Sequence, residues 1–222
     1  MSAHIFVIED DVELAQSLKV LLTSAGVDSV RLFGSPLEFI KSYPSLTETL
    51  QEPGCVLLDM RMPDMTGSEL FALMQSQNFP WPVIFMTGHG DLSMAVNLMK
   101  AGAFDYVTKP FDPMGLFEKV KAATQLSRVR ITDQLFKREQ LLKLNSLTHH
   151  ESLVFARILN NQTNREIAEA LENSVRTIET HRANILKKMG KSSALELAQL
   201  HERFTLLGGV TPFPMAQQTP GP

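Results

Sequence analysis

The sequence has few of the features that mark secreted and membrane proteins. It contains one cysteine, Cys55, so no internal disulfide can form, and a reducing, cytoplasmic environment is expected. Its longest apolar runs, such as Cys55–Leu58 and Val83–Met86, are far too short to cross a bilayer. The first residues lack the basic and apolar regions of a signal peptide. Because 44% of the 222 residues are hydrophobic, global disorder is excluded, and a soluble globular protein without a membrane partner is expected.

Glycine and proline are missing from one long stretch. Neither residue occurs between Leu116 and Met189, although residues 1–115 contain eight of each. A stretch of 74 residues without these turn-forming residues predicts helices joined by short polar turns. After Gly209 the sequence is rich in Pro, Gln and Thr and cannot bury a core, so residues 209–222 are expected to form a flexible tail.

Basic charge is also scarce overall, since the net charge of −3 argues at first against nucleic acid as a partner. That sum combines two unequal parts. Residues 1–120 carry 7 basic and 15 acidic residues, net −8, whereas residues 121–222 carry 14 basic and 9 acidic residues, net +5. An acidic half followed by a basic half predicts two domains with different partners, and nucleic acid is a candidate partner of the second.

In the first half, short β-prone segments alternate with helical patterns. Leu14, Leu18 and Leu22 recur at helical spacing, and similar patterns follow around Leu70 and Leu98. Strand–helix alternation implies right-handed crossovers and a parallel sheet, with the ligand site beyond the carboxyl ends of the strands. The predicted strands are Ile5–Ile8, Val30–Phe33, Cys55–Leu58, Val83–Met86 and Tyr106–Val107.

Polar and charged residues follow four of these strands. The first strand runs into Glu9 and Asp10, the third into Asp59, the fourth into Thr87 and the fifth into Lys109. Clustered carboxylates repel one another, and a hard divalent cation such as Mg2+ removes that conflict. The lysine and the hydroxyl can hold phosphoryl oxygens, while an ionised carboxylate can attack phosphorus and form an aspartyl phosphate.

Five separated motifs in this half resemble the receiver domain of bacterial two-component response regulators. They occur in order within residues 3–122: Val-Ile-Glu-Asp-Asp, Leu-Leu-Asp-Met-Arg-Met-Pro, Met-Thr-Gly, Asp-Tyr-Val and Thr-Lys-Pro-Phe. The resemblance implies an α/β flavodoxin-like fold with a five-stranded parallel sheet of order 2-1-3-4-5. It makes Asp59 the phosphoacceptor, Thr87 and Tyr106 the switch pair, and Lys109 the phosphate-sensing lysine before a cis bond to Pro110. It also implies Mg2+ ligands from Asp10, Asp59, the backbone carbonyl of Arg61 and, through water, Glu9.

Two of these assignments have an alternative. Glu9 departs from the family pattern, in which Asp is commoner, and its extra methylene puts the tightness of Mg2+ binding in question. Tyr106 has the alternative of a packing residue, since the rotation of an aromatic ring cannot be inferred from spacing. Asp11, which follows Glu9 and Asp10 in the sequence, is expected to cap the first helix.

Four helix starts follow in close order in the basic half. Before them, Leu116–Asn145 is interpreted as the last helix of the first domain continuing into a polar linker, without the clean heptad of a coiled coil. Four compact helices in a basic segment predict a helix-turn-helix module. The predicted starts are the capping boxes Thr148–Glu151, Thr163–Glu166 and Ser193–Glu196 and the N-cap Ser174, whose helix Val175–Met189 ends at Gly190.

Helical spacing divides Val175–Met189 into two faces. Ile178 and His181 lie on the face expected to pack inward, so a core position is favoured for the histidine. On the opposite face, the small residues Thr180 and Ala183 allow close approach to base edges, and basic residues reach phosphates or guanine edges. The predicted DNA contacts are Asn164, Arg176, Thr177, Glu179, Thr180, Arg182, Ala183 and Lys187.

Residues 147–200 resemble the LuxR/FixJ-type helix-turn-helix domain over nearly their whole length. Its motifs here are Asn-Arg-Glu-Ile-Ala from Asn164 and Ser-Val-Arg-Thr-Ile-Glu-Thr-His-Arg from Ser174. The resemblance implies an all-α four-helix domain in which Val175–Lys188 is the recognition helix and Ala194–Phe204 helps to dimerise the DNA-bound form. The expected plan is a receiver in residues 1–122, a helical linker in 123–145, a DNA-binding domain in 146–208 and a tail in 209–222.

Together the two resemblances imply a response regulator transcription factor of the FixJ/NarL type. A sensor histidine kinase would phosphorylate Asp59, and the protein would then form a homodimer, bind promoter DNA and contact RNA polymerase. Because it turns over no external substrate, it is not expected to be an enzyme. One alternative is a DNA-binding regulator whose receiver only dimerises. The other is a phosphatase with an aspartyl-phosphate intermediate, but Arg61 stands where such enzymes need a second acid.

Overall fold

The computed structural model of the chain describes residues 3–46, 49–88 and 92–214. It divides into two compact units, Met1–Thr132 and Asp133–Pro222, and the boundary falls inside one long helix, α5 (Pro113–Asn145). The part of the predicted tail beyond residue 214 lies outside the described residues. Among the residues described, no helix is both long and apolar enough to span a membrane.

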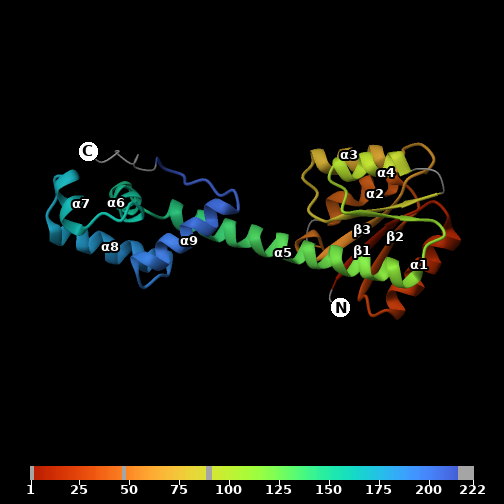
Figure 1. Cartoon of the computed structure of the whole chain (residues 1–222), viewed down its shortest axis with the longest axis horizontal. Coiled ribbons are helices and arrows are strands. Elements are labelled where there is room, and N and C mark those ends of the chain that lie inside the picture. Colours follow the sequence, from red (N-terminus) through yellow and green to blue (C-terminus); the bar gives the residue numbers. More distant parts are fainter. Residues whose placement is uncertain (1–2, 47–48, 89–91, 215–222) are drawn as a thin grey trace. The chain divides into compact units, whose positions relative to one another are not determined.

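A parallel sheet forms the centre of the first unit (Figure 1). Its strands are β1 (His4–Ile8), β2 (Ser29–Phe33), β3 (Gly54–Asp59), β4 (Val83–Thr87) and β5 (Asp105–Thr108). Their order is β2-β1-β3-β4-β5, which confirms the five predicted strands and the expected flavodoxin-like topology. Ile5 of β1, for example, pairs with Val30 of β2 on one side and Cys55 of β3 on the other.

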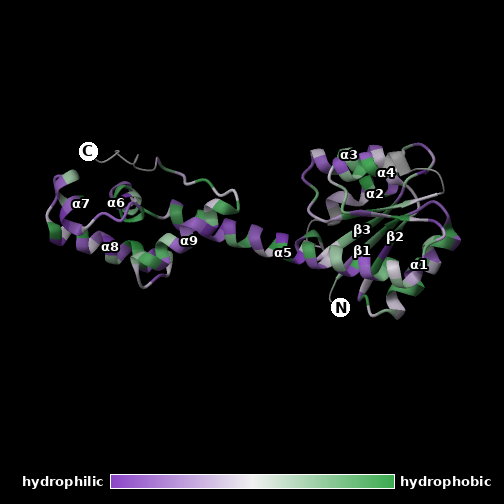
Figure 2. Ribbon diagram, viewed as in Figure 1, coloured by the Kyte–Doolittle hydropathy of each residue, from purple (hydrophilic) through white to green (hydrophobic). Residues whose placement is uncertain are grey.

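Helices cover both faces of this sheet. They are α1 (Val12–Ser24), α2 (Pro36–Ser42), α3 (Gly67–Ser76) and α4 (Leu92–Lys100), together with α5. Figure 1 shows α2, α3 and α4 on one face and α1 and α5 on the other. Alternate strand residues therefore enter two separate cores: Phe6 and Ile8 pack on the first side, and Ile5 and Val7 on the second. The central strands are accordingly hydrophobic along their length (green in Figure 2).

Local sequence signals explain where α1 begins, but α2 is absent from the sequence predictions. Asp11 caps α1 as expected, because its Oδ1 accepts the N–H groups of Glu13 and Leu14 at 3.0 and 3.1 Å. At α2, Ser35 is the N-cap and Pro36 occupies the first turn. With only seven residues, α2 is too short to show helical periodicity in the sequence. Two 3-10 helices that follow it, Tyr43–Leu46 and Thr49–Gln51, are also absent from the predictions.

The helix α5 is continuous over 33 residues, as the lack of glycine and proline indicated. It begins at Pro113, three residues before the predicted start at Leu116, because its first turn accommodates Pro113 and Gly115, and it ends at the predicted residue, Asn145. Ala123 and Ser127 are fully buried, and the Ser127 hydroxyl accepts the N–H of Gly54 at 3.1 Å. Packing in the first unit therefore extends along α5 beyond residue 122.

The second unit packs four further helices against the end of α5. They are α6 (His149–Leu159), α7 (Asn164–Ala170), α8 (Val175–Met189) and α9 (Ala194–Leu206). Thr148 and Thr163 form the predicted capping boxes, Ser174 caps α8, and Gly190 ends it in the left-handed conformation at φ +65°. The third box differs from its prediction: Ser193 caps α9, but the Glu196 carboxylate accepts the N–H of Ser192, at 3.0 Å.

After α9 the chain turns back towards its own core. Gly208 has φ +77°, and the next residue, Gly209, donates its N–H to the carbonyl of Phe204 at 2.8 Å. Phe213 then lies edge-on to Phe155 with ring centroids 5.8 Å apart. The first residues of the predicted tail are thus in contact with the core of the second unit.

Candidate functional site

The predicted site residues of the first unit meet at the carboxyl edge of the sheet. Glu9 follows β1, Asp59 ends β3, Thr87 ends β4 and Lys109 follows β5. Because all strands are parallel, these ends lie at the same edge. The backbone also links two of them directly, since the N–H of Lys109 donates to the carbonyl of Thr87 at 2.6 Å.

Three carboxylates form the acidic part of this site. Glu9 and Asp59 are buried, with 2% and 5% exposure, whereas Asp10 is exposed. One oxygen from each of the three lies within 4.8 Å of the others. Burial raises the pKa of Glu9 above the usual carboxyl range, and the hydrogen bond from Lys109 only partly offsets this effect. A cluster of hard oxygen donors with one side open to solvent fits the coordination that Mg2+ prefers.

Lys109 joins two of these carboxylates. Its Nζ donates to Glu9 Oε2 at 2.7 Å and to Asp59 Oδ1 at 2.5 Å. Burial alone would lower the pKa of Lys109, but the hydrogen bonds to Asp59 and Glu9 outweigh it and raise that pKa. The lysine therefore stays charged at the position where a group attached to Asp59 would carry negative charge. The Lys109–Pro110 bond is cis, as expected.

Arg61 and Gly67 both contact Asp59, and neither contact was predicted from the sequence. The N–H of Arg61 donates to Asp59 Oδ2 at 2.8 Å. Gly67, the first residue of α3, lies so close that a Cβ there would be 2.0 Å from the carbonyl oxygen of Asp59. Its N–H also donates to the carbonyl of Met60 at 3.1 Å. A glycine three residues before the helical pattern around Leu70 was the available signal, but a glycine there fits several structural roles.

The predicted switch pair lies on two neighbouring strands. Thr87 is buried, and its hydroxyl donates to the carbonyl of Gly88 at 3.1 Å. Thr87 pairs with Thr108 across the sheet, so Tyr106, two residues earlier on β5, projects from the same face. Tyr106 is half-buried against the core beneath α2, α3 and α4. Beside it, the carboxylate of Asp105 forms an ion pair with Lys119 of α5, a contact that was not predicted.

In the second unit, α8 has the two faces that its sequence predicts. Ile178 is fully buried in the core of the unit, whereas Arg176, Thr180, Ala183 and Lys187 are exposed. The Thr180 hydroxyl donates to the Arg176 carbonyl at 3.0 Å, so it has a local partner as well as an exposed position. The face therefore combines small and basic side chains, which a helix in a major groove needs.

The remaining predicted DNA contacts lie around this face. Thr177 and Arg182 are half-buried, Glu179 is exposed, and Asn164 is half-buried as the first residue of α7. The Thr177 hydroxyl lies 2.8 Å from that of Ser174, so it belongs to the capped start of α8.

His181 lies at the rim of the core rather than inside it. It is half-buried, and its ring stacks on that of His150 from α6, with centroids 6.1 Å apart and planes at 16°. The sequence predicted a core position for His181. The histidine does face α6, but it is only half-buried. The stacked pair is thus a contact between α6 and α8.

Comparison with known proteins agrees with both parts of this description. A model of the response regulator receiver domain matches residues 5–121, and a model of bacterial regulatory proteins of the luxR family matches residues 145–201. The chain belongs to the response regulators. Within that family it combines a receiver with a LuxR-type domain, which makes it a transcription factor rather than an enzyme.

Curated response regulators resemble this chain over most of its length. The transcriptional regulatory protein FixJ of Bradyrhizobium diazoefficiens is 36% identical over 204 residues, covering 92% of this chain and 97% of that protein. The transcriptional regulatory protein TdiR of Thauera aromatica is 34% identical over 196 residues, covering 88% of this chain and 84% of that protein.

Two solved response regulators have the same fold. StyR, at 33% identity and a TM-score of 0.80, covers 91% of this chain and 100% of its own. Full-length FixJ from B. japonicum, at 36% identity and a TM-score of 0.56, covers 91% of this chain and 97% of its own. These structures confirm the predicted fold class, a flavodoxin-like receiver followed by a helical DNA-binding domain.

Proposed function

We propose that this response regulator accepts a phosphoryl group on Asp59 and then binds promoter DNA as a homodimer. The observation that carries the proposal is the contact of Lys109 with both Glu9 and Asp59 at the carboxyl edge of the sheet. A charged lysine on a buried carboxylate beside two further acids is an arrangement suited to phosphoryl transfer. The donor would be a phosphohistidine of a sensor kinase, and the transfer would take place in the cytoplasm.

The chain's own groups prepare Asp59 for this reaction. A carboxylate oxygen of Asp59 forms a bond to phosphorus while the bond from phosphorus to the kinase histidine nitrogen breaks. The N–H of Arg61 holds the other oxygen at 2.8 Å, which fixes the orientation of the carboxylate. Lys109 then pairs with phosphoryl oxygens in place of Asp59 Oδ1.

The three acids would hold Mg2+ during this transfer. We assign its ligands to Asp10, Asp59, the carbonyl of Arg61 and, through water, Glu9. This assignment is supported by the three carboxylates, each of which has an oxygen within 4.8 Å of the others. When bound, Mg2+ neutralises negative charge on the transferred phosphoryl oxygens. Exposure of Asp10 leaves that side of the site open to the ion and to the donor.

Phosphorylation would act through Thr87 and Tyr106. Within the part of the chain that the structure describes, the Thr87 hydroxyl donates to the adjacent Gly88 carbonyl at 3.1 Å, and a phosphoryl oxygen is a stronger acceptor. Moving this hydroxyl inwards frees space for Tyr106, which reshapes the surface of α4 and β5. That change would favour a dimer, because the phosphorylated state gains contacts that the unmodified state lacks.

The second unit would deliver the response by placing α8 in the major groove. Its exposed small residues allow close approach, and Arg176 and Lys187 reach phosphates or guanine edges. A dimer would present two such helices to two half-sites, and bound to a promoter it would contact RNA polymerase.

The test compares Asp59→Asn with Asp64→Asn, which changes an exposed acid in the loop that follows β3. Each full-length variant is treated with acetyl phosphate and Mg2+, and its mass, oligomeric state and affinity for duplex DNA are measured. We expect Asp64→Asn to gain one phosphoryl group, to dimerise and to bind DNA more tightly, as the unchanged chain does. Asp59→Asn should do none of these.

The same measurements decide for or against the rival function, a regulator whose receiver only dimerises. If the unchanged chain binds DNA equally well with and without the phosphodonor, phosphate control is contradicted. If Asp59→Asn still gains a phosphoryl group, Asp59 is not the acceptor.

A further inference from the structure

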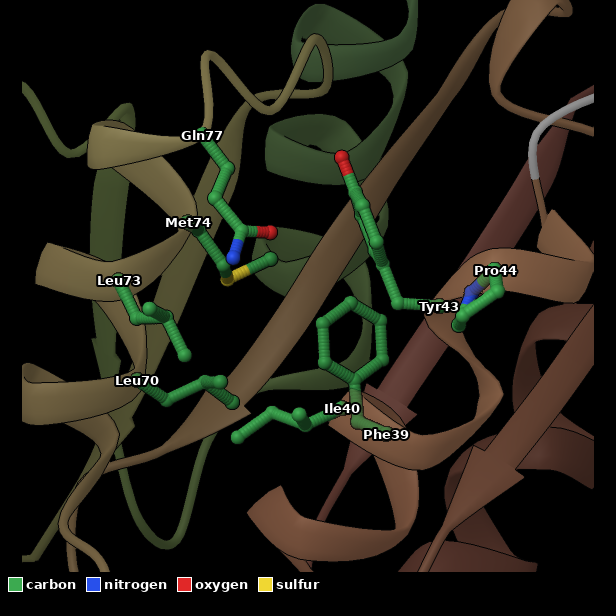
Figure 3. Close-up of a pocket in the computed structure, with 8 residues that line it drawn as sticks. All are labelled: Phe39, Ile40, Tyr43, Pro44, Leu70, Leu73, Met74 and Gln77. Atoms are coloured by element: carbon green, nitrogen blue, oxygen red, sulfur yellow. The ribbon is translucent and has the colours of Figure 1, made fainter.

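A second concave site lies on the first unit, away from the acidic edge of the sheet. It is formed between α2 with the 3-10 helix that follows it, on one side, and α3 on the other, and encloses about 210 Å³ (Figure 3). The residues around it are Phe39, Ile40, Tyr43, Pro44, Leu70, Leu73, Met74 and Gln77. We refer to it as the α2–α3 pocket.

The pocket is mainly apolar, and its polar groups lie at one end. Its walls are mostly aliphatic and aromatic side chains, and none of the described residues that line it is charged. The hydroxyl of Tyr43 and the amide of Gln77 lie towards the same end of the pocket (Figure 3). An apolar chamber with two hydrogen-bonding groups at one end favours a neutral ligand that carries a single polar substituent.

The walls of the pocket are held by contacts that do not depend on a ligand. Phe39 is 2% exposed and lies edge-on to Tyr43, with ring centroids 6.2 Å apart. On the other side, Leu70 is fully buried, and Thr66 and Glu69 form a capping box at the start of α3. A pocket fixed in this way binds a small ligand without first having to order its own side chains.

Size then selects the class of ligand. A protein cavity of about 150 Å³ lined by Leu, Ile and Phe is known to bind benzene, and this pocket is somewhat larger and lined by similar residues. We propose that the α2–α3 pocket binds a neutral monocyclic aromatic molecule bearing one hydroxyl group. The ring lies against Phe39 and Met74, and the hydroxyl meets Tyr43 and Gln77.

The test uses phenol as the probe on the full-length chain with its methyl groups labelled with carbon-13. Phenol should shift the methyl resonances of Ile40, Leu73 and Met74 in a saturable way. The methyl of Met189, buried in the second unit, should not move. Benzoate has the same ring with a charge, and it should produce no saturable shift because none of the eight residues named around the pocket is a cation.

Two variants localise the binding. Leu73→Trp places a large side chain in the pocket and should weaken phenol binding at least tenfold. Leu37→Trp makes the same change on α2 at an exposed residue that does not line the pocket, and it should leave the affinity unchanged. Tyr43→Phe should weaken phenol about fivefold, as expected for one neutral hydrogen bond, and leave benzene affinity unchanged.

Each other outcome overturns the proposal. Phenol shifts that do not saturate, or that survive in Leu73→Trp, would show that the pocket is not the binding site. Equal losses of phenol and benzene affinity in Tyr43→Phe would show that the Tyr43 hydroxyl does not bind the hydroxyl of the ligand. Shifts of these methyls with protein concentration alone would make a second copy of the chain the occupant.

Discussion

At the scale of single residues, the position of the Asp59 carboxylate, the proposed phosphoacceptor, depends on a neighbour without a side chain. Gly67 begins α3 directly against the backbone of Asp59, and the site for a Cβ lies 2.0 Å from the carbonyl oxygen of that residue. Any other residue must push β3 and α3 apart at the point where Asp59, the proposed phosphoacceptor, is held. The glycine thus sets the position of Asp59 relative to Lys109.

Gly67→Ala should therefore destabilise the first unit and disturb its site. We expect the free energy of unfolding to fall by about 1–3 kcal/mol, the usual cost of overpacking. The rate of labelling by acetyl phosphate should fall as well. Urea unfolding followed by the fluorescence of Trp81, the single and buried tryptophan, measures the first effect. Gly34→Ala is the control, because a Cβ there meets its nearest atom at 3.5 Å; equal stability of the two variants would contradict this role.

The contrast between these residues shows what a sequence can predict about a site. Glu9, Asp59, Thr87 and Lys109 were predictable because parallel strands end at one edge, so residues far apart in sequence must meet there. Gly67 was not predictable, because its role follows from how closely one helix approaches one carbonyl. That distance depends on the packed structure and leaves no distinct pattern in the sequence.

At the scale of elements, two neighbouring lysines of α8 have different environments. Lys188 donates to Glu151 Oε2 at 2.6 Å and to the carbonyl of Ser146 at 2.9 Å, so it ties α8 to the start of α6. Burial would raise the pKa of Glu151, but the bonds from Lys188 and Thr148 outweigh it and lower that pKa. Lys187, one position earlier, is exposed on the predicted DNA face.

Replacing each of these lysines by methionine should separate folding from DNA binding. Lys188→Met leaves the buried carboxylate of Glu151 without its cation and should lower the stability of the second unit by about 1.5–3 kcal/mol. Lys187→Met should leave stability within about 0.5 kcal/mol and weaken DNA binding. Chemical denaturation followed by circular dichroism, with fluorescence anisotropy on labelled duplex DNA, measures both quantities. The reverse pattern would show that Lys188, and not Lys187, faces the DNA.

Some helices could be located from the sequence, and others could not. The helices α6, α7 and α8 were located by their capping residues, and α5 by a stretch without glycine or proline. α2 was missed because seven residues hold too few apolar positions to show a period. The Ser193 box was half right, since which backbone N–H the Glu196 carboxylate accepts depends on the loop conformation before α9.

At the scale of the whole molecule, acidic and basic residues are concentrated in different halves of the chain. The acidic half contains the three carboxylates at the sheet edge, and the basic half contains the exposed face of α8. At physiological ionic strength charges are screened beyond about 8 Å, so DNA responds to the basic groups near it and not to the net charge of −3. Affinity for DNA should therefore depend on a few cations of the second unit.

The salt dependence of binding tests this view on the full-length chain. The logarithm of the association constant for duplex DNA should fall linearly with the logarithm of salt concentration, because each phosphate contact releases counterions. Removing one such contact by Arg176→Ala should make the slope shallower by about 0.9. Arg130→Ala removes an equal charge from an exposed position on α5 and should leave the slope unchanged. Because both variants have the same net charge, a shallower slope in Arg176→Ala alone would assign the effect to a local contact of α8. Equal slopes in the two variants would instead mean that Arg176 does not touch the DNA backbone.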